Sequence, residues 1–151
     1  MEDFQGKVAF ITGGGSGVAL GQAKVFGKAG CRVVIADIRE DHLAHGLREL
    51  SAQGMECHGI RLDITDREAY ARAADETERV FGPVQLLFNT AGVSLFGPLE
   101  KSSYDDYDWQ MNVNFGGVVN GIQTFVPRMI AYAQGGHIVN TSSMAGFLGL
   151  F

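Results

Sequence analysis

Short apolar runs alternate regularly along the chain with longer segments of helical periodicity, and this pattern limits the possible folds more than any other feature. The first run, KVAFITG (7–13), is rich in β-branched and aromatic residues, which indicates a strand buried on both faces. Alternation of this kind is typical of a doubly wound parallel sheet, so we expect one α/β domain over residues 1–151. Further strands are predicted at 32–37, 56–63, 84–92 and 136–143, with helices at 21–30, 39–54, 65–82 and from about 104 to 133.

The helix at 65–82 carries the clearest local signals. Thr65 and Glu68 have the spacing of a capping box, and Tyr70 and Ala73 begin an apolar stripe. We therefore expect Thr65 to cap this helix.

Charge and composition exclude several classes of partner. The net charge is −5 and the 12 lysines and arginines are scattered, so no basic face for nucleic acid is expected. The N-terminus lacks an apolar signal segment, and no apolar run is long enough to span a membrane. Cys31 and Cys57 lack close metal-ligating neighbours, so both are predicted to be small buried hydrophobes, with no metal site. Together these observations predict a cytoplasmic protein without nucleic-acid or membrane partners.

A glycine-rich loop follows the first strand. TGGGSGVALG (12–21) lies where a strand ends and a helix begins, and glycine there lets the backbone turn tightly and approach a pyrophosphate. Asp37 ends the next strand, where a carboxylate can accept both hydroxyls of an adenosine ribose. Asp37 can also be a helix N-cap, and the two roles can coexist. Because Asp37 would repel a 2′-phosphate and Ser16 offers it no positive charge, the pattern favours NAD over NADP.

These motifs resemble the short-chain dehydrogenase/reductase family, whose loop reads T-G-x-x-x-G-x-G. Thr12, Gly13 and Gly17 match, whereas Ala19 stands in the place of the third glycine. We expect the extra methyl group to weaken cofactor binding without abolishing it, and Gly21 to relieve the crowding. The resemblance implies a Rossmann-like fold and hydride transfer between NAD and an alcohol or ketone.

Two further segments match the family at strand ends. In RLDIT, Asp63 and the Ile64 backbone are expected to face the adenine, although Asp63 can simply cap the end of the strand. FNTAG (88–92) is similar to the family's N-N-A-G motif, with threonine in place of the second asparagine. The resemblance places its Asn89, Ala91 and Gly92 at the cofactor ribose. The candidate cofactor-binding residues are thus Gly13, Ser16, Gly17, Val18, Asp37, Ile38, Asp63, Ile64, Asn89, Ala91 and Gly92.

The resemblance also implies catalytic residues. The family uses a tyrosine base assisted by a lysine four residues later, a serine that holds the substrate oxygen, and a helix asparagine that holds a water relay. Asn114 in NVNFGG aligns with that asparagine and Ser143 in NTSSMAG with the serine. The alternative roles are an exposed helix residue for Asn114 and a turn former for Ser143.

The tyrosine and lysine of this motif are not found within residues 1–151. None of the tyrosines, at 70, 104, 107 and 132, is followed by a lysine four residues later. We therefore expect the chain to be truncated after the fifth strand, to cover about three fifths of a family member, and to lack activity alone. The apolar residues at 147–151 would then await a packing partner. The resemblance implies a homodimer or homotetramer for the parent protein.

A narrower resemblance concerns substrate. GQAKVFGKAG, DREAYARAADE, FGPLEKSSYDDYDW and GGVVNGIQTFVPRMI are similar to segments of bacterial Cα-dehydrogenases of aryl ethers, which oxidise a benzylic alcohol to a ketone with NAD. The YDDYDW part also fits an ordinary helix start with acidic residues at the positive end of the dipole.

Two other functions compete with this interpretation. A non-catalytic dinucleotide-binding module fits residues 1–151 by themselves, because they carry the cofactor motifs without the tyrosine and lysine pair. An epimerase of the extended branch would carry T-G-x-x-G-x-x-G, a spacing that the loop does not have. The fold alone does not decide between these functions.

Overall fold

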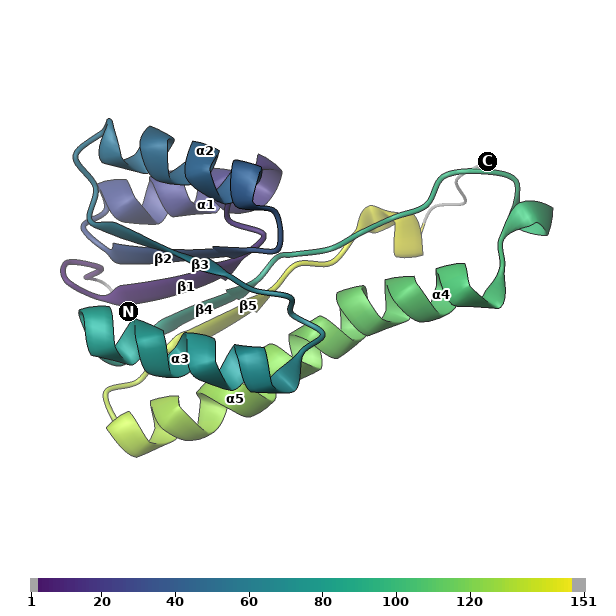
Figure 1. Cartoon of the computed structure of the whole chain (residues 1–151). Helices are drawn as coiled ribbons and strands as arrows, with labels where there is room; N and C mark the ends of the chain where they lie inside the picture. The colour runs from purple at the N-terminus through teal and green to yellow at the C-terminus, as the bar shows by residue number, and fades with distance from the viewer. Residues whose placement is uncertain (1–2, 148–151) are drawn as a thin grey trace.

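The structure is a computed structural model, described here for residues 3–147, so the expected apolar end at 148–151 lies outside the described residues. Five parallel strands form one sheet in the order β3-β2-β1-β4-β5, which confirms the predicted doubly wound α/β fold (Figure 1). The strands pair in register, for example Phe10 with Val34 and Phe10 with Leu87. The strands are β1 (Val8–Thr12), β2 (Arg32–Asp37), β3 (Cys57–Arg61), β4 (Leu86–Asn89) and β5 (His137–Asn140).

Helices cover both faces of the sheet. Helices α1 and α2 lie on one face, and α3 and α5 on the other, while α4 extends beyond the strand ends (Figure 1). Their bounds are α1 (Gly17–Lys28), α2 (Glu40–Ser51), α3 (Arg67–Phe81), α4 (Tyr104–Met111) and α5 (Gly117–Tyr132), with short turns η1 (Leu99–Lys101) and η3 (Met144–Gly146). No helix within residues 3–147 is long and apolar enough to cross a membrane.

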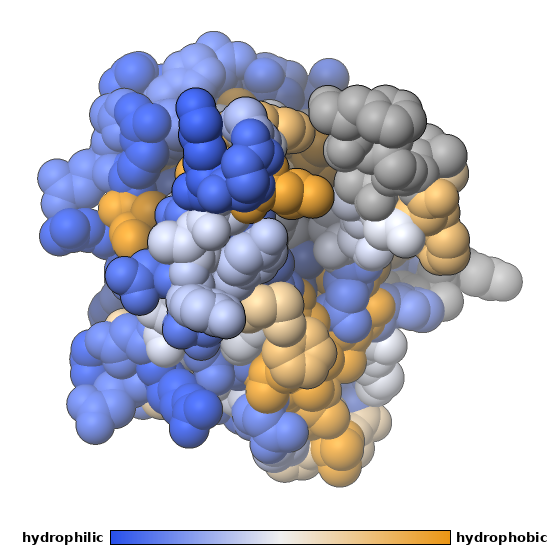
Figure 2. Space-filling view, turned by 90° about the vertical axis from the view of Figure 1, so that its right-hand side faces the viewer, coloured by the Kyte–Doolittle hydropathy of each residue, from blue (hydrophilic) through white to orange (hydrophobic). Residues whose placement is uncertain are grey.

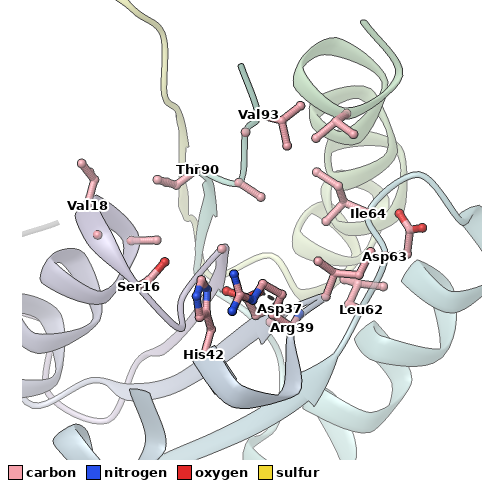
Figure 3. Close-up of a pocket in the computed structure, with 18 of the residues that line it drawn as sticks. Ser16, Val18, Asp37, Arg39, His42, Leu62, Asp63, Ile64, Thr90 and Val93 are labelled. Atoms are coloured by element: carbon pink, nitrogen blue, oxygen red, sulfur yellow. Dashed lines mark hydrogen bonds between the residues drawn. The ribbon is translucent and has the colours of Figure 1, made fainter. Parts of the chain in front are cut away.

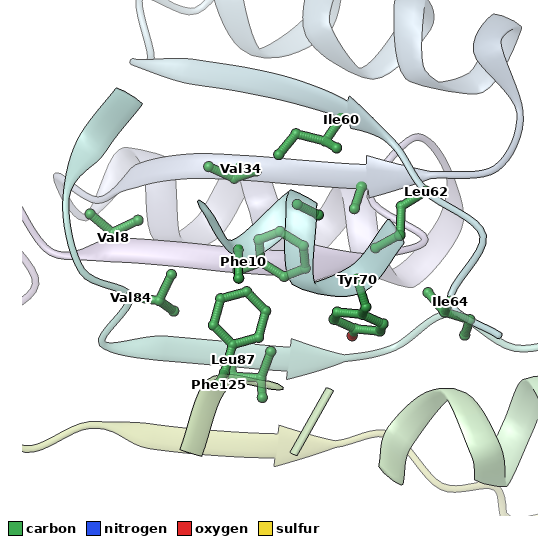
Figure 4. Packing of buried hydrophobic residues seen from close by; sticks show 13 residues of the cluster. Val8, Phe10, Val34, Ile60, Leu62, Ile64, Tyr70, Val84, Leu87 and Phe125 are labelled. Atoms are coloured by element: carbon green, nitrogen blue, oxygen red, sulfur yellow. The ribbon is translucent and has the colours of Figure 1, made fainter. Parts of the chain in front are cut away.

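Two apolar clusters, one on each side of the sheet, form the core. On the α3 and α5 side, the rings of Phe10 and Phe125 lie 4.6 Å apart and Tyr70 packs beside them (Figure 4). Burial raises the pKa of the Tyr70 hydroxyl above its ordinary range. On the other side, Cys31 is buried as predicted, and burial raises the pKa of its thiol to about 11. Cys57 is only partly buried, so the prediction for this cysteine was wrong.

Two predicted helix starts were wrong. Helix α1 begins at Gly17, four residues earlier than predicted, because the glycine loop itself turns into the helix. Helix α3 is capped by Asp66, whose carboxylate accepts a hydrogen bond from the Ala69 amide (2.9 Å). The Thr65 hydroxyl instead donates to Asp63 (2.7 Å), so the expected capping box does not form.

The long helix predicted from about 104 to 133 is not one regular α-helix. A π-helical segment, η2 (Asn112–Gly116), separates α4 from α5. Such wide turns are often found at functional sites, and this one contains the candidate residue Asn114.

Candidate functional site

A cavity of about 520 Å³ lies at the carboxyl ends of the strands, within the range of small-molecule sites (Figure 3). In an open parallel sheet, this edge is where ligands bind. The glycine loop, the ends of β2 and β3 and the segment after β4 all contribute walls (Figure 3). The lining residues are Gly13, Ser16, Gly17, Val18, Ala19, Ala36, Asp37, Ile38, Arg39, His42, Leu62, Asp63, Ile64, Thr90, Ala91, Gly92, Val93, Trp109 and Val113.

The glycine loop depends on glycine at two positions. Gly13 (φ +71°) and Gly17 (φ +52°) both adopt backbone conformations that other residues rarely adopt. At Gly13 a Cβ atom would also lie 3.0 Å from Ala91 Cα, so the loop packs directly against the segment after β4. The two glycines that match the family motif are therefore required by the backbone.

The N-terminus of α1 opens toward the cavity. Ser16 is the N-cap residue, and its side chain makes no capping hydrogen bond. The first amide groups of a helix have no partner within the helix and attract an anion. Ser16, Gly17 and the exposed Val18 all line the cavity, so an anionic group can reach these amides.

Asp37 is held in place at the cavity wall. The residue is 8% exposed, and its two carboxylate oxygens accept hydrogen bonds from the amides of Gly15 (3.2 Å) and Arg39 (3.0 Å). Each oxygen therefore keeps a lone pair for another donor. Asp37 is not the N-cap of α2, because that position belongs to Arg39. Beside it, Ile38 is exposed and lines the cavity.

Two basic side chains that the sequence analysis did not select lie next to Asp37. Arg39 and His42 both line the cavity, at the start of α2 (Figure 3). The Arg39 guanidinium makes two hydrogen bonds to the Asp41 carboxylate, from Nε (3.0 Å) and Nη2 (2.6 Å). A sequence signal was available, because the run REDH (39–42) begins two residues after the strand end that carries Asp37.

The opposite wall comes from the segment after β3. Leu62 and Ile64 are buried and line the cavity, whereas Asp63 is exposed at its rim (Figure 3). The Asp63 carboxylate accepts a hydrogen bond from the Thr65 amide (2.9 Å), so the alternative role of a cap at the end of the strand is present, and a role toward the adenine stays a prediction. Asn120 on α5, which the sequence analysis missed, donates to the Ile64 carbonyl (2.9 Å) and fixes this wall.

The structure does not bring Asn89 into the cavity lining. The residue is 3% exposed, and its side chain donates to Asn140 Oδ1 (2.9 Å) while accepting from the Tyr70 hydroxyl (3.4 Å). Ala91 and Gly92 do line the cavity, together with Thr90. Asn89 therefore joins β4 to β5 and α3 beneath the site.

Thr12 joins the two halves of this edge. Its hydroxyl accepts hydrogen bonds from the amides of Thr90 (3.0 Å) and Ala91 (3.1 Å) and donates to the Phe88 carbonyl (3.3 Å). The end of β1 is thus tied to the segment after β4. A threonine in the family motif has a clear structural purpose here.

Asn114 binds the chain beside the cavity. Its Nδ2 donates to the Val93 carbonyl and its Oδ1 accepts from the Val93 amide, both at 2.8 Å. Gly92 leaves room for this contact, because a Cβ atom there would lie 3.1 Å from Asn114 Oδ1. Asn114 is not itself a lining residue, and the two bonds leave one N–H group and one oxygen lone pair of its side chain for a water molecule.

Ser143 is exposed and lies between β5 and η3, outside the cavity lining. Ala19, by contrast, is buried (3% exposed) and lines the cavity, so its effect on cofactor affinity stays a prediction. Gly21 is exposed, and a Cβ atom there would have no neighbour within 4 Å. The expectation that Gly21 relieves crowding at Ala19 was therefore wrong.

The fold and this cavity place the chain in a known class. The short chain dehydrogenase family matches residues 7–151, and the chain belongs to this family of oxidoreductases. The predicted resemblance is thereby confirmed.

Particular relatives are similar over almost the whole chain. It is 60% identical over 150 residues to a C alpha-dehydrogenase from Sphingobium sp., covering 99% of this chain and 49% of that protein. The crystal structure of LigO from Sphingobium sp. strain SYK-6 is 61% identical with a TM-score of 0.96, covering 99% of this chain and 56% of that one. A short-chain dehydrogenase/reductase from Burkholderia phymatum in complex with NAD is 41% identical with a TM-score of 0.94, covering 99% and 53%.

The chain thus spans about half the length of the curated relatives that it matches. Of the solved relatives' chains it covers 53% to 64%, in agreement with the three fifths expected from the sequence.

Proposed function

We propose that residues 1–151 form the NAD-binding part of a dehydrogenase that oxidises a secondary alcohol to a ketone. The observation that carries the proposal is the Asp37 carboxylate, which is fixed by two backbone amides at the wall of the cavity and keeps acceptor capacity on both oxygens. A ribose diol supplies two donors to such a carboxylate. The N-terminus of α1 would take the pyrophosphate, and Leu62 and Ile64 would contact the adenine.

The same carboxylate supports NAD over NADP. A phosphate on the 2′-oxygen would bring its negative charge against Asp37, and the phosphate could not donate the hydrogen bonds that the diol donates. The resemblance to a relative solved with NAD supports the same cofactor. When bound, NAD would accept a hydride from the alcohol carbon.

We assign Ser143 to the substrate oxygen and Asn114 to the positioning of the chain at Val93. Loss of the hydride must be balanced by loss of the hydroxyl proton, and a base is needed to take this proton. The family's tyrosine and lysine pair is not among residues 1–151. We therefore propose oxidation for a longer protein that contains this pair in addition to residues 1–151. Residues 1–151 would supply its cofactor-binding site.

The substrate class that we propose is a benzylic secondary alcohol. Its support is the 60% identity to a C alpha-dehydrogenase, together with the quoted segments that led to the same resemblance. Localisation in the cytoplasm stays part of this proposal.

A homodimer or homotetramer is also proposed for the parent protein. Tyr107, Met111, Phe115 and Val119 follow one another at four-residue spacing along α4, η2 and α5, and all four are exposed. Figure 2 shows apolar surface on the lower half of the face, the half in which α4 and α5 lie in Figure 1. Exposed apolar patches of this kind are typical of interaction sites.

Two measurements test the proposed function. Calorimetric titration should show NAD binding to the 151-residue chain, and Asp37→Ala should weaken it. The 151-residue chain should form no NADH from NAD and a benzylic secondary alcohol, as monitored by absorbance. A product of the reading frame that contains a Tyr-x-x-x-Lys motif should form NADH with the same alcohol. Binding of NAD without turnover by that longer product would favour the non-catalytic module instead, and absence of NAD binding would contradict both.

A further inference from the structure

The wall of the cavity beside Asp37 carries a cation that is already paired. Arg39 follows Asp37 by two residues, and its backbone amide is bonded to Asp37 Oδ1 (3.0 Å). Its side chain therefore starts from a point fixed next to the proposed ribose site. An arginine at such a point is able to bind a 2′-phosphate, since guanidinium groups bind phosphate through two parallel hydrogen bonds.

Asp41 occupies this guanidinium. Nε donates to Oδ1 (3.0 Å) and Nη2 donates to Oδ2 (2.6 Å), so the bidentate geometry that would suit a phosphate is taken by a carboxylate. A neighbouring ion pair does not involve this guanidinium. Glu40 Oε1 lies 3.3 Å from Arg61 Nη1, and Arg61 does not line the cavity. Arg39 is thus the arginine at the described cavity wall, and Asp41 is its partner.

The ion pair stabilises the charged forms of both Arg39 and Asp41. The hydrogen bonds from Arg39 lower the pKa of the Asp41 carboxyl to about 2, and the same contact raises the pKa of Arg39 above its ordinary value. Both side chains are nevertheless more than half exposed, so solvent screens the pair and a stronger anion can compete for the guanidinium.

We propose that Asp41 is a specificity-determining residue, which disfavours NADP by keeping the Arg39 guanidinium occupied. The inference rests on the proposed function, because it concerns the same adenosine site. Asp37 excludes the 2′-phosphate by direct repulsion. Asp41 acts indirectly: its ion pair with Arg39 keeps the guanidinium from binding the 2′-phosphate and offsetting this repulsion.

The test measures NAD and NADP affinities of the 151-residue chain by calorimetry, with NADP also titrated in competition with NAD. Asp41→Asn should tighten NADP binding about fivefold, the factor at the upper end of measured exposed ion pairs. NAD affinity should change by less than about twofold, because the ribose diol does not require a free cation. The double variant Arg39→Met/Asp41→Asn should lose the gain in NADP affinity.

Asp75→Asn is the matched control. Asp75 also forms an ion pair, since its Oδ1 lies 2.6 Å from Arg128 Nη2. Its side chain is 67% exposed, compared with 65% for Asp41. This variant removes the same charge away from the cavity and should leave both affinities unchanged. An unchanged NADP affinity in Asp41→Asn, a gain that persists without Arg39, or an equal gain in Asp75→Asn would each overturn the inference. If the wild-type chain does not bind NAD, the proposed function itself fails, and this inference fails with it.

Discussion

Gly117 allows α5 to pack against the wall of the cavity, and this contact gives a quantitative prediction. A Cβ atom at Gly117 would lie 2.8 Å from Ile64 Cγ1 and closer still to Ile64 Cδ1. Ile64 is buried, and its side chain lines the cavity. Gly117→Ala therefore forces a methyl group into occupied space on the side of the wall that faces α5.

The magnitude follows from two opposing effects. Overpacking a core costs about 1–3 kcal/mol, whereas alanine in place of glycine within a helix gains about 1 kcal/mol. We expect Gly117→Ala to lower the free energy of unfolding by about 1 kcal/mol, which is the difference between these effects near the middle of the range. Ile64→Val removes the Cδ1 methyl and alone should cost about 1 kcal/mol.

The double variant separates this explanation from a general loss of stability. In Gly117→Ala/Ile64→Val the new methyl occupies the space that Cδ1 leaves, so the double variant should be more stable than the sum of the single effects by at least about 1 kcal/mol. Urea unfolding followed by circular dichroism measures this coupling, with a midpoint shift of about 0.5 M at ordinary slopes. Gly21→Ala, at an exposed helix position without neighbours, is the control and should be slightly stabilising. Additive single effects, within about 0.3 kcal/mol, would show that the Gly117 methyl and Ile64 Cδ1 do not compete for the same space.

Three further predictions concern Asn114, Cys31 and Asp41. Asn114→Ala removes both bonds to Val93, so amide exchange at 92–94 should accelerate by more than about tenfold, as measured by mass spectrometry, and unchanged protection would contradict it. Burial raises the pKa of Cys31 to about 11, so iodoacetamide at pH 8 should label the partly buried Cys57 first, and peptide mapping that finds Cys31 labelled first would count against this burial. The pKa of Asp41 is lowered from 3.8 to about 2, so its pair with Arg39 should stabilise the fold fully above pH 3.8 and be lost as the pH falls toward 2. A carboxyl titration by NMR measures this pKa. A pKa that is not lowered, or that is the same in Arg39→Met, would exclude the pair.

The sequence predicted the parts of the site that depend on local backbone chemistry. Gly13 and Gly17 were identified from the loop motif, and both adopt positive φ angles. Asp37 was identified from its place at the end of a buried strand, and it does line the cavity. In each case the residue type and its neighbours along the chain contain the information.

Roles that depend on distant contacts were not predictable in this way. Asn89 and Asn114 are both amides in matching motifs, yet one is buried against Asn140 and the other binds the Val93 backbone. The bond from Asn120 to the Ile64 carbonyl joins elements more than fifty residues apart. No local pattern specifies such pairings, because they depend on how α5 packs over the sheet.

Some local signals had competing outcomes. Thr65 and Glu68 had capping-box spacing, but Asp66 accepts the hydrogen bond from the third residue of the helix and leaves Thr65 to bond Asp63. The pair of Arg39 and Asp41 was missed because residues two apart do not face each other on a regular helix. Here Arg39 is the N-cap residue in an extended conformation, which brings its side chain to Asp41.

We propose that the glycine loop and the end of β2 hold the adenosine diphosphate part of NAD. The most direct test is an NMR titration of the isotopically labelled chain with NAD, following each backbone amide. We expect the largest shift changes at Gly13, Ser16, Gly17 and Asp37, and none at Gly54 or Gly82, which follow the opposite ends of α2 and α3. Shift changes confined to other parts of the chain, or none at all with saturating NAD, would contradict it.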